Sequence, residues 1–309
     1  MGHRIAAAFT LSSVLSLASI CAAYAQRDFA QVEIKTTKVA DGIYMLEGAG
    51  GNIGLLIGED GAFVIDDQYA PLSDKIMKAI GKVTKEPVEF VVNTHYHGDH
   101  TGGNEAFGEA GSHIVAHDNV RKRMMEPNIL PDGAVTPPSP EGALPVLTFS
   151  EAMSFHWNGQ DIRVWHQSAA HTDGDAVVYF KTANVVHMGD LMINGGYPFV
   201  DITSGGVLSG YAGYYEKVLS KVDDEVKVIP GHGPLATKAD LQNYADMLKE
   251  VARLIRAEID AGKSEDETVA ANPLRDLNEK WGQGFISGEA MTRAAYKSLT
   301  AEHEGGHDH

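Results

Sequence analysis

Residues 91–103 read Val91-Val92-Asn93-Thr94-His95-Tyr96-His97-Gly98-Asp99-His100-Thr101-Gly102-Gly103, and they continue a strand-like run that starts at residue 88. In an extended segment, residues two apart point to the same side, so His95 and His97 can face one ion at the end of a strand. Gly98 lets the chain turn without a side-chain clash, and Asp99 and His100 then point to a second position nearby. Imidazole suits zinc and carboxylate adds oxygen ligands, so this mixture favours zinc over iron or manganese.

Three further stretches bring a histidine or an aspartate to the border of an apolar strand. They are Ser168–Asp175 with His171, Val185–Asp190, and Val228–Gly233 with His232. Loops at the carboxyl ends of strands converge on a common crevice in layered folds, so these side chains are candidates for one site. A single such histidine is more often structural, and a single Gly-Asp is more often a turn. The joint occurrence is what indicates a metal site.

Together with the H-x-H-x-D-H pattern at residues 95–100, these stretches resemble the metallo-β-lactamase superfamily. The resemblance covers about residues 32 to 260 and implies a site for two zinc ions bridged by one aspartate. The implied ligands are His95, His97 and His171 for one ion, Asp99, His100 and His232 for the other, and Asp190 for both.

The resemblance also implies a reaction. Two zinc ions would hold a bridging water whose pKa falls towards about 7, and the resulting hydroxide would attack a carbonyl carbon. Asp99 would orient this hydroxide as well as bind metal. Asp66 ends the strand 63–65 and matches the superfamily's early aspartate, which would fix the metal-binding loop by accepting a hydrogen bond. A simple strand-terminal cap is the alternative role for Asp66.

The substrate class stays open between β-lactams, lactones, esters and thioesters. The segment 171–180 resembles true metallo-β-lactamases more than it resembles glyoxalase II. Two departures weaken that likeness, because the largest lactamase subgroup has cysteine where this chain has Asp190, and a carboxylate-binding lysine where it has Ile193. The resemblance therefore implies an exported dinuclear zinc hydrolase with at most modest β-lactamase activity. A glyoxalase II-like thioester hydrolase or a lactonase is the alternative hydrolase.

Other classes of protein use the same fold. An iron dioxygenase is disfavoured by Asp190 and His232, and a diiron oxidoreductase is disfavoured by His97, where its members usually carry glutamate. A non-catalytic periplasmic protein that binds metal or assists a redox pathway remains an alternative, because it would keep the same ligands. Metal content and the turnover of an activated ester separate these classes.

Hydrophobic periodicity and turn residues predict a mixed α/β fold. Strands are expected within 32–47 on both sides of Asp41-Gly42, and at 54–57, 62–65, 88–94, 112–116, 146–149, 153–157, 161–166, 176–181, 184–188 and 226–229. Helices are expected at 73–83, 103–108, 118–125, 211–219, 265–271 and 287–299. A further helix is expected to begin at a capping box at Thr237. The resemblance implies that these elements form a four-layer αββα sandwich.

The two ends of the chain differ from its middle. Residues 1–25 carry Arg4, a small and apolar stretch, and Ala23-Tyr24-Ala25, which predicts a cleavable signal peptide and a periplasmic or secreted protein. Residues 26–262 are expected to form the catalytic domain. Residues 263–309 are expected to form a helical extension with a disordered, His-rich tail from His303.

The stretch 127–145 holds six prolines and no clear periodicity. Proline-rich connections of this length inside a compact domain often act as binding loops or lids. A plain surface excursion is an equally good interpretation of this stretch.

Composition limits the partners. The 309 residues are 43% hydrophobic, which is enough for a sizeable core. Cys21 is the only cysteine and would leave with the signal peptide, so no disulfide or thiolate ligand is expected. The formal net charge of −17 argues against nucleic acid, and against a membrane surface after signal cleavage. The expected partner is a small-molecule substrate, and the sequence does not indicate an oligomeric state.

Overall fold

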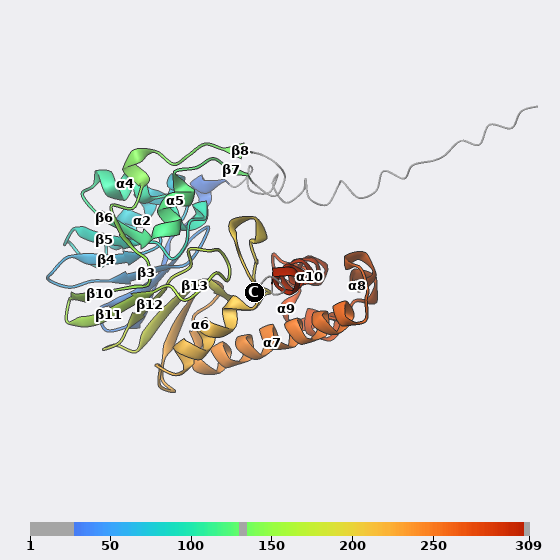
Figure 1. Ribbon diagram of the computed structural model, residues 1–309. Helices are drawn as coiled ribbons and strands as arrows, with labels where there is room; N and C mark the ends of the chain where they lie inside the picture. The colour runs from blue at the N-terminus through green and yellow to red at the C-terminus, as the bar shows by residue number, and fades with distance from the viewer. Residues whose placement is uncertain (1–27, 130–134, 306–309) are drawn as a thin grey trace, which may run out of the picture.

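The computed structural model describes residues 28–129 and 135–305, and Figure 1 shows two stacked sheets with helices outside them. Within these residues, no helix is long and apolar enough to cross a membrane. The predicted signal peptide at residues 1–25 and the last four residues lie outside the described part of the chain.

The first sheet begins as an antiparallel meander and continues with parallel strands. Its order is β1 (Lys35–Ala40), β2 (Ile43–Glu47), β3 (Ile53–Leu56), β4 (Ala62–Ile65), β5 (Val88–Val92), β6 (His113–His117) and β9 (Leu147–Phe149). From β4 to β9 the neighbours run parallel. Every residue of β3 and β4 is buried, as expected for strands covered on both faces.

The second sheet contributes the other half of the sandwich. Its order is β10 (Ala152–Trp157), β11 (Gln160–Trp165), β12 (Val177–Phe180), β13 (Val185–Ile193), β14 (Lys227–His232) and β15 (Ala236–Thr237). Only β13 and β14 run parallel in it. Between the sheets, the Phe63 ring packs edge-on against Phe155 and Phe180, with centroids 5.0 and 6.2 Å apart.

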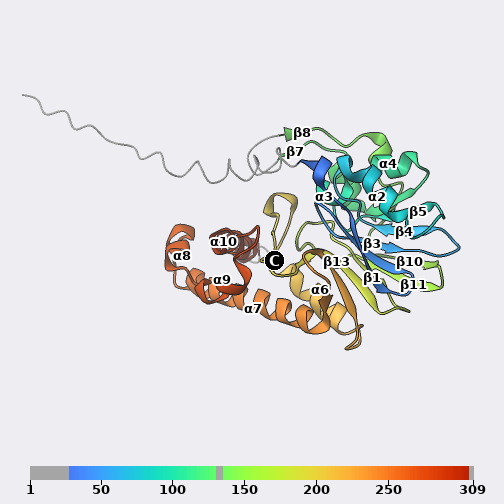
Figure 2. The ribbon, with the colours of Figure 1, turned by 180° about the vertical axis from the view of Figure 1, so that it is seen from behind.

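Helices complete the four layers that the resemblance implied. The outer face of the first sheet is covered by α2 (Ser73–Ile80) and α4 (Asn104–Glu109), through Ile76 and Phe107. The outer face of the second sheet is covered by α6 (Gly210–Leu219) and α7 (Lys238–Asp260). The predicted capping box of α7 is confirmed, because Thr237 and Asp240 each bond the other's backbone N–H. Figure 2 shows these layers from behind.

Several predicted elements differ from the observed ones. The strand expected at 184–188 runs on to Ile193, so Asp190 lies inside β13 rather than at its end. The strand continues past residue 188 because its pairing with β14 shifts register twice, once on each side of Gly189. Gly189 has a φ of +51° at this irregularity. The motif after β5 forms one helical turn, α3 (Gly98–Thr101), where only a turn was expected.

The proline-rich stretch is also more regular than expected. It contains the two-stranded hairpin of β7 (Asn128–Ile129) and β8 (Val135–Thr136), followed by a 3-10 turn at Glu141–Ala143. The helix α5 (Asp118–Met124) precedes it as predicted.

The helical end of the chain packs against the body. It consists of α8 (Glu265–Ala271), α9 (Arg275–Trp281) and α10 (Gly288–Gly305). The sequence analysis missed α9, and the described part of α10 runs to Gly305. Figures 1 and 2 place these helices beyond the sandwich, along α7. Trp281 meets Tyr244 of α7 edge-on at 5.5 Å, and Tyr244 stacks on Tyr215 of α6.

This packing predicts that the helical end unfolds together with the sandwich. Trp281→Ala should lower the free energy of unfolding by about 3–5 kcal/mol, because it opens a cavity in the cluster shared by α6, α7 and α9. Urea denaturation followed by circular dichroism measures this change. Phe285→Ala is the control, since its side chain is 58% exposed, and it should cost much less. The prediction would be contradicted if Trp281→Ala produced a separate transition at lower urea concentration and left the main transition unchanged.

Candidate metal centre

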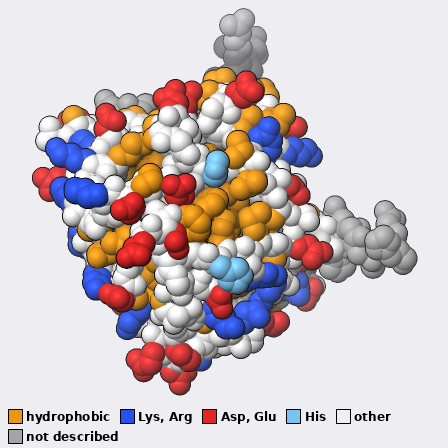
Figure 3. Space-filling model, turned by 90° about the vertical axis from the view of Figure 1, so that its left-hand side faces the viewer, with side chains coloured by type: hydrophobic (Ala, Val, Ile, Leu, Met, Phe, Trp, Pro, Cys, Tyr) orange, Lys and Arg blue, Asp and Glu red, His pale blue; other side chains and the backbone are white. Residues whose placement is uncertain are grey.

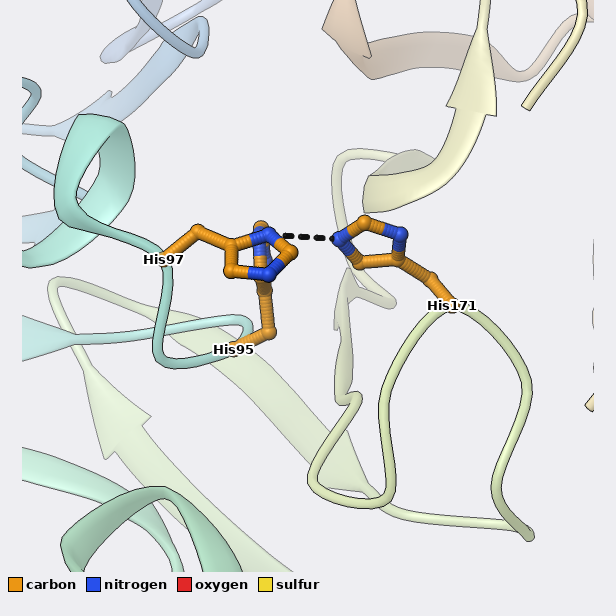
Figure 4. Close-up of side chains that lie close together, drawn as sticks. All are labelled: His95, His97 and His171. Atoms are coloured by element: carbon orange, nitrogen blue, oxygen red, sulfur yellow. Dashed lines mark hydrogen bonds between the residues drawn. The ribbon is translucent and has the colours of Figure 1, made fainter. Parts of the chain in front are cut away.

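Three imidazoles meet at the open ends of both sheets. His95 and His97 lie on the loop after β5, and His171 lies on the loop before β12 (Figure 4). His97 Nδ1 is 3.1 Å from His95 Nε2 and 3.0 Å from His171 Nε2. A tetrahedral zinc ion with Zn–N bonds of about 2.0–2.1 Å separates its nitrogen ligands by roughly 3.3 Å. The three nitrogens are therefore spaced as ligands of one ion.

A second group lies beside the first. The Nε2 atoms of His100 and His232 are 3.4 Å apart, and Asp99 Oδ2 is 3.4 Å from His232 Nε2. His100 comes from α3, and His232 ends β14. The residues thus come from the two halves of the sandwich, which brings positions far apart in the sequence to one place.

Asp190 lies between the two groups. Its Oδ1 is 3.2 Å from His100 Nε2, and its Oδ2 is 3.4 Å from His232 Nε2 and 3.8 Å from His171 Nε2. Oδ1 is buried and has no hydrogen-bond partner among the described residues. A buried carboxylate oxygen without a partner is costly unless a cation completes it. A cation held between the two groups would satisfy this oxygen.

Glycine makes this approach possible. A Cβ on Gly231 would come within 2.0 Å of Asp190 Oδ1, and a Cβ on Gly51 would come within 2.1 Å of the His100 ring. Both glycines leave room for side chains that must sit against the backbone.

The outer ring nitrogens show which lone pairs face inward. Thr94 Oγ1 donates to Asp66 Oδ2 at 2.8 Å, so it accepts from His95 Nδ1 at 3.0 Å. His100 Nδ1 donates to the same Asp66 oxygen at 2.8 Å. Both imidazoles consequently turn Nε2 towards the cluster. A hydrogen-bonded outer nitrogen is how proteins orient histidine ligands of metals.

Asp66 organises this side of the site. It is fully buried and also accepts from the Thr94 backbone N–H at 2.7 Å. Its backbone is left-handed, with a φ of +59°, which is uncommon for a residue other than glycine. The contact with the metal-binding loop that the sequence predicted is therefore present.

The other two imidazoles are oriented by a loop that the sequence analysis did not single out. His97 Nε2 lies 3.0 Å from Asp201 Oδ2, and His171 Nδ1 lies 2.5 Å from the Phe199 carbonyl oxygen. Donation to these acceptors leaves His97 Nδ1 and His171 Nε2 free to bind an ion. The Phe199 ring also lies 5.9 Å from each of these two imidazole rings, centroid to centroid.

Asp201 could not be recognised from sequence. It caps a 3-10 turn, Ile202–Ser204, by accepting from the Ser204 N–H, so its local pattern indicates only a turn. Burial alone would raise the pKa of Asp201, but its bonds to His97 and the capped turn hold that pKa well below the ordinary value. An ionised carboxylate therefore faces His97.

The electrostatics divide the site into two halves. Burial, together with neighbouring imidazoles, lowers the pKa of His171 to about 4 and places that of His95 well below its usual range. Burial also opposes charge on His232, but Asp190 and Asp99 raise its pKa to about 10. Thus the group that contains His95 and His171 keeps neutral imidazoles, while the group that contains His232 attracts positive charge. Both properties suit metal cations, whose ligands must be deprotonated.

The remaining histidines of the described residues have structural surroundings. His187 is fully buried and bonds the Asn52 carbonyl oxygen at 3.0 Å. His117 and His166 stack with their ring centroids 4.0 Å apart. These contacts fit structural roles for the three histidines.

Comparison with known proteins identifies the family and the fold. A family model described as the metallo-beta-lactamase superfamily matches residues 46–232, a range that contains all seven candidate ligands. A curated relative, the 2,4-dinitroanisole O-demethylase subunit alpha of Nocardioides sp. (strain JS1661), is 24% identical over 142 residues. That match covers 45% of this chain and only 40% of the relative.

Two solved structures share the fold. A metallo-beta-lactamase from Pontibacter korlensis superposes with a TM-score of 0.59 at 20% identity, over 70% of this chain and 99% of its own. The DIM-1 metallo-beta-lactamase superposes with a TM-score of 0.58 at 17% identity, over 71% of this chain and 99% of its own.

The Asp201 contact predicts a role in metal affinity. Asp201→Asn should weaken metal binding by about 10–100-fold, because His97 loses a charged acceptor for its outer N–H. Competition with a chromogenic chelator measures the affinity. Asp74→Asn, on the exposed face of α2, is the matched control and should leave the affinity unchanged. Equal affinities of the two variants would show that Asp201 does not position His97.

Proposed function

This chain belongs to the metallo-β-lactamase superfamily, and from that premise we propose that it is a dinuclear zinc hydrolase that cleaves carbonyl compounds. The proposal names esters, thioesters and lactones as preferred substrates and β-lactams as weaker ones. The observation that carries it is the inward-facing set of imidazole nitrogens around the unpartnered oxygen of Asp190.

We assign the ions to the two groups described above. One ion would be held by His95, His97 and His171, the other by Asp99, His100 and His232, and Asp190 would contact both. Imidazole and carboxylate without thiolate suit zinc, and they also accommodate iron or manganese. When bound, the ions would supply Lewis-acid polarisation of the carbonyl and a water of lowered pKa.

The protein's own residues would orient the reactants. Asp99 is the acidic group for this task, since its side chain remains 19% exposed. Burial opposes its ionisation, but His100 and His232 lower the pKa of Asp99 to about 2, so its carboxylate can accept a proton from a water beside it. Phe199 would form an apolar wall beside His97 and His171, which favours an uncharged acyl group there.

The residues at positions 193 and 123 favour esters over β-lactams. Three residues after Asp190 stands Ile193, which is apolar. Arg123 lies 5.6 Å from the Tyr96 ring, but it forms a bidentate ion pair with Asp173. A substrate carboxylate would therefore lack a ready partner, whereas a neutral ester, thioester or lactone needs none.

β-Lactam hydrolysis is kept as the second candidate because the fold matches two metallo-β-lactamases over nearly their whole length. Measuring hydrolysis of a chromogenic cephalosporin, an aryl ester, a thioester and a lactone by metal-loaded protein, with metal stoichiometry on the same sample, decides between them. Two ions with no turnover of any of these would favour the non-catalytic alternative. We also propose export, on the pattern of residues 1–25.

His97→Ala should abolish turnover and reduce bound metal, because His97 Nδ1 lies next to both other imidazole donors. The fold should persist, as judged by circular dichroism, since His97 lies outside the apolar clusters. His113→Ala, on an exposed part of β6, is the control and should keep full activity. Full activity of His97→Ala would refute the site assignment.

Asp190→Cys tests the substrate preference. Cysteine at this position is the lactamase-like ligand, so the ratio of kcat/KM for a cephalosporin to that for an aryl ester should rise. Steady-state rates of wild-type and variant at equal metal loading measure that ratio. If it stays the same, ligand identity at residue 190 does not limit β-lactam turnover.

A further inference from the structure

A groove separate from the metal centre lies on the outer face of the second sheet, beside α6. Its volume is about 470 Å³, and it is lined by residues in or next to β10, β11, β12 and α6. None of the seven candidate metal ligands lines it. A volume of this size suits a small organic molecule.

Basic side chains dominate the groove. Arg163, Lys181, Lys217 and Lys221 line it, and within the described residues none of them forms an ion pair. Figure 3 shows one face of the molecule, with basic side chains gathered low on its right-hand side. The chain as a whole carries −17, so four unpaired cations in one groove run against its overall charge.

The groove contains little to neutralise these cations. Asp161 is its only lining carboxylate, and it bonds His156 at 2.8 Å. Lys217 Nζ donates to the Gln167 side-chain oxygen, which is neutral. Burial and the neighbouring Lys221 and Arg163 lower the pKa of Lys217, whereas Glu151 opposes this shift. An anion would relieve the repulsion between these cations.

An unsatisfied donor accompanies the charge. Trp165 lines the groove and is 2% exposed, and its buried indole N–H has no acceptor among the described residues. Lys217 Nζ lies 5.5 Å from the centroid of the same ring. Buried donors are nearly always paired, so an acceptor that is not part of the chain would complete this one.

We propose that this groove binds a small organic anion that carries a phosphate or carboxylate group. The cations would receive the anionic group, and the Trp165 N–H would donate to one of the ligand's oxygens. A polyanionic macromolecule fits less well, because the negative charge of the rest of the chain would repel it. The proposal does not depend on the reaction at the metal centre.

Isothermal titration of the metal-loaded protein with phenylphosphonate, which resists hydrolysis, tests the proposal. The double variant Lys217→Gln/Lys221→Gln should weaken binding by at least about 10-fold, because hydrogen bonds to charged groups are lost. The matched control is Lys78→Gln/Lys82→Gln, which removes two exposed lysines with the same spacing on and after α2. It should change the affinity by less than about 2-fold.

Three results would overturn the proposal. The first is a dissociation constant weaker than about 1 mM in the wild-type protein. The second is equal binding by the two double variants, which would place phenylphosphonate elsewhere, such as at the metal ions. The third is sedimentation with phosphatidylglycerol vesicles that requires Lys217 and Lys221 but that phenylphosphonate does not reduce, which would assign the groove to a lipid surface.

Discussion

The structure depends on holding several imidazole and carboxylate groups in one largely buried space. Such groups repel one another or lack partners unless something compensates them. Here the compensation is built from outside the cluster, since Asp66, Thr94, Asp201 and the Phe199 carbonyl each accept from an outer ring nitrogen. The inner lone pairs then face one another, and the unpartnered oxygen of Asp190 lies among them. A metal cation would satisfy this arrangement.

Both halves of the sandwich are needed to create that space. The first sheet supplies the 95–100 motif and Asp66, and the second supplies Asp190 and His232. Asn52 ties the halves together, because its side chain donates to the carbonyl oxygens of Pro230 and Gly233 in the β14 region. The packing of Phe63 between the sheets therefore supports the site as well as the core.

The helical end contributes to the site indirectly. The loop after β13 carries Phe199 and Asp201, and Tyr197 at its base donates to Asn278 of α9 at 3.0 Å. The Tyr197 backbone N–H also donates to the Trp281 carbonyl oxygen. The elements that orient His97 and His171 are thus anchored on helices that lie outside the matched family region. Through these two hydrogen bonds, α9 supports the loop that orients His97 and His171.

The sequence by itself determined the local features of this protein. The dense motif at 95–100, the strand-border positions of His171 and His232, and the capping box at Thr237 all depend on residues close together in the chain. The sandwich came from the resemblance rather than from periodicity. Tertiary structure alone decided which distant groups meet. Asp201 resembles an ordinary turn cap, α9 is a short helix, and the cations of the groove lie on separate strands and a helix. Their roles arise from packing across the fold, which no short stretch of sequence records.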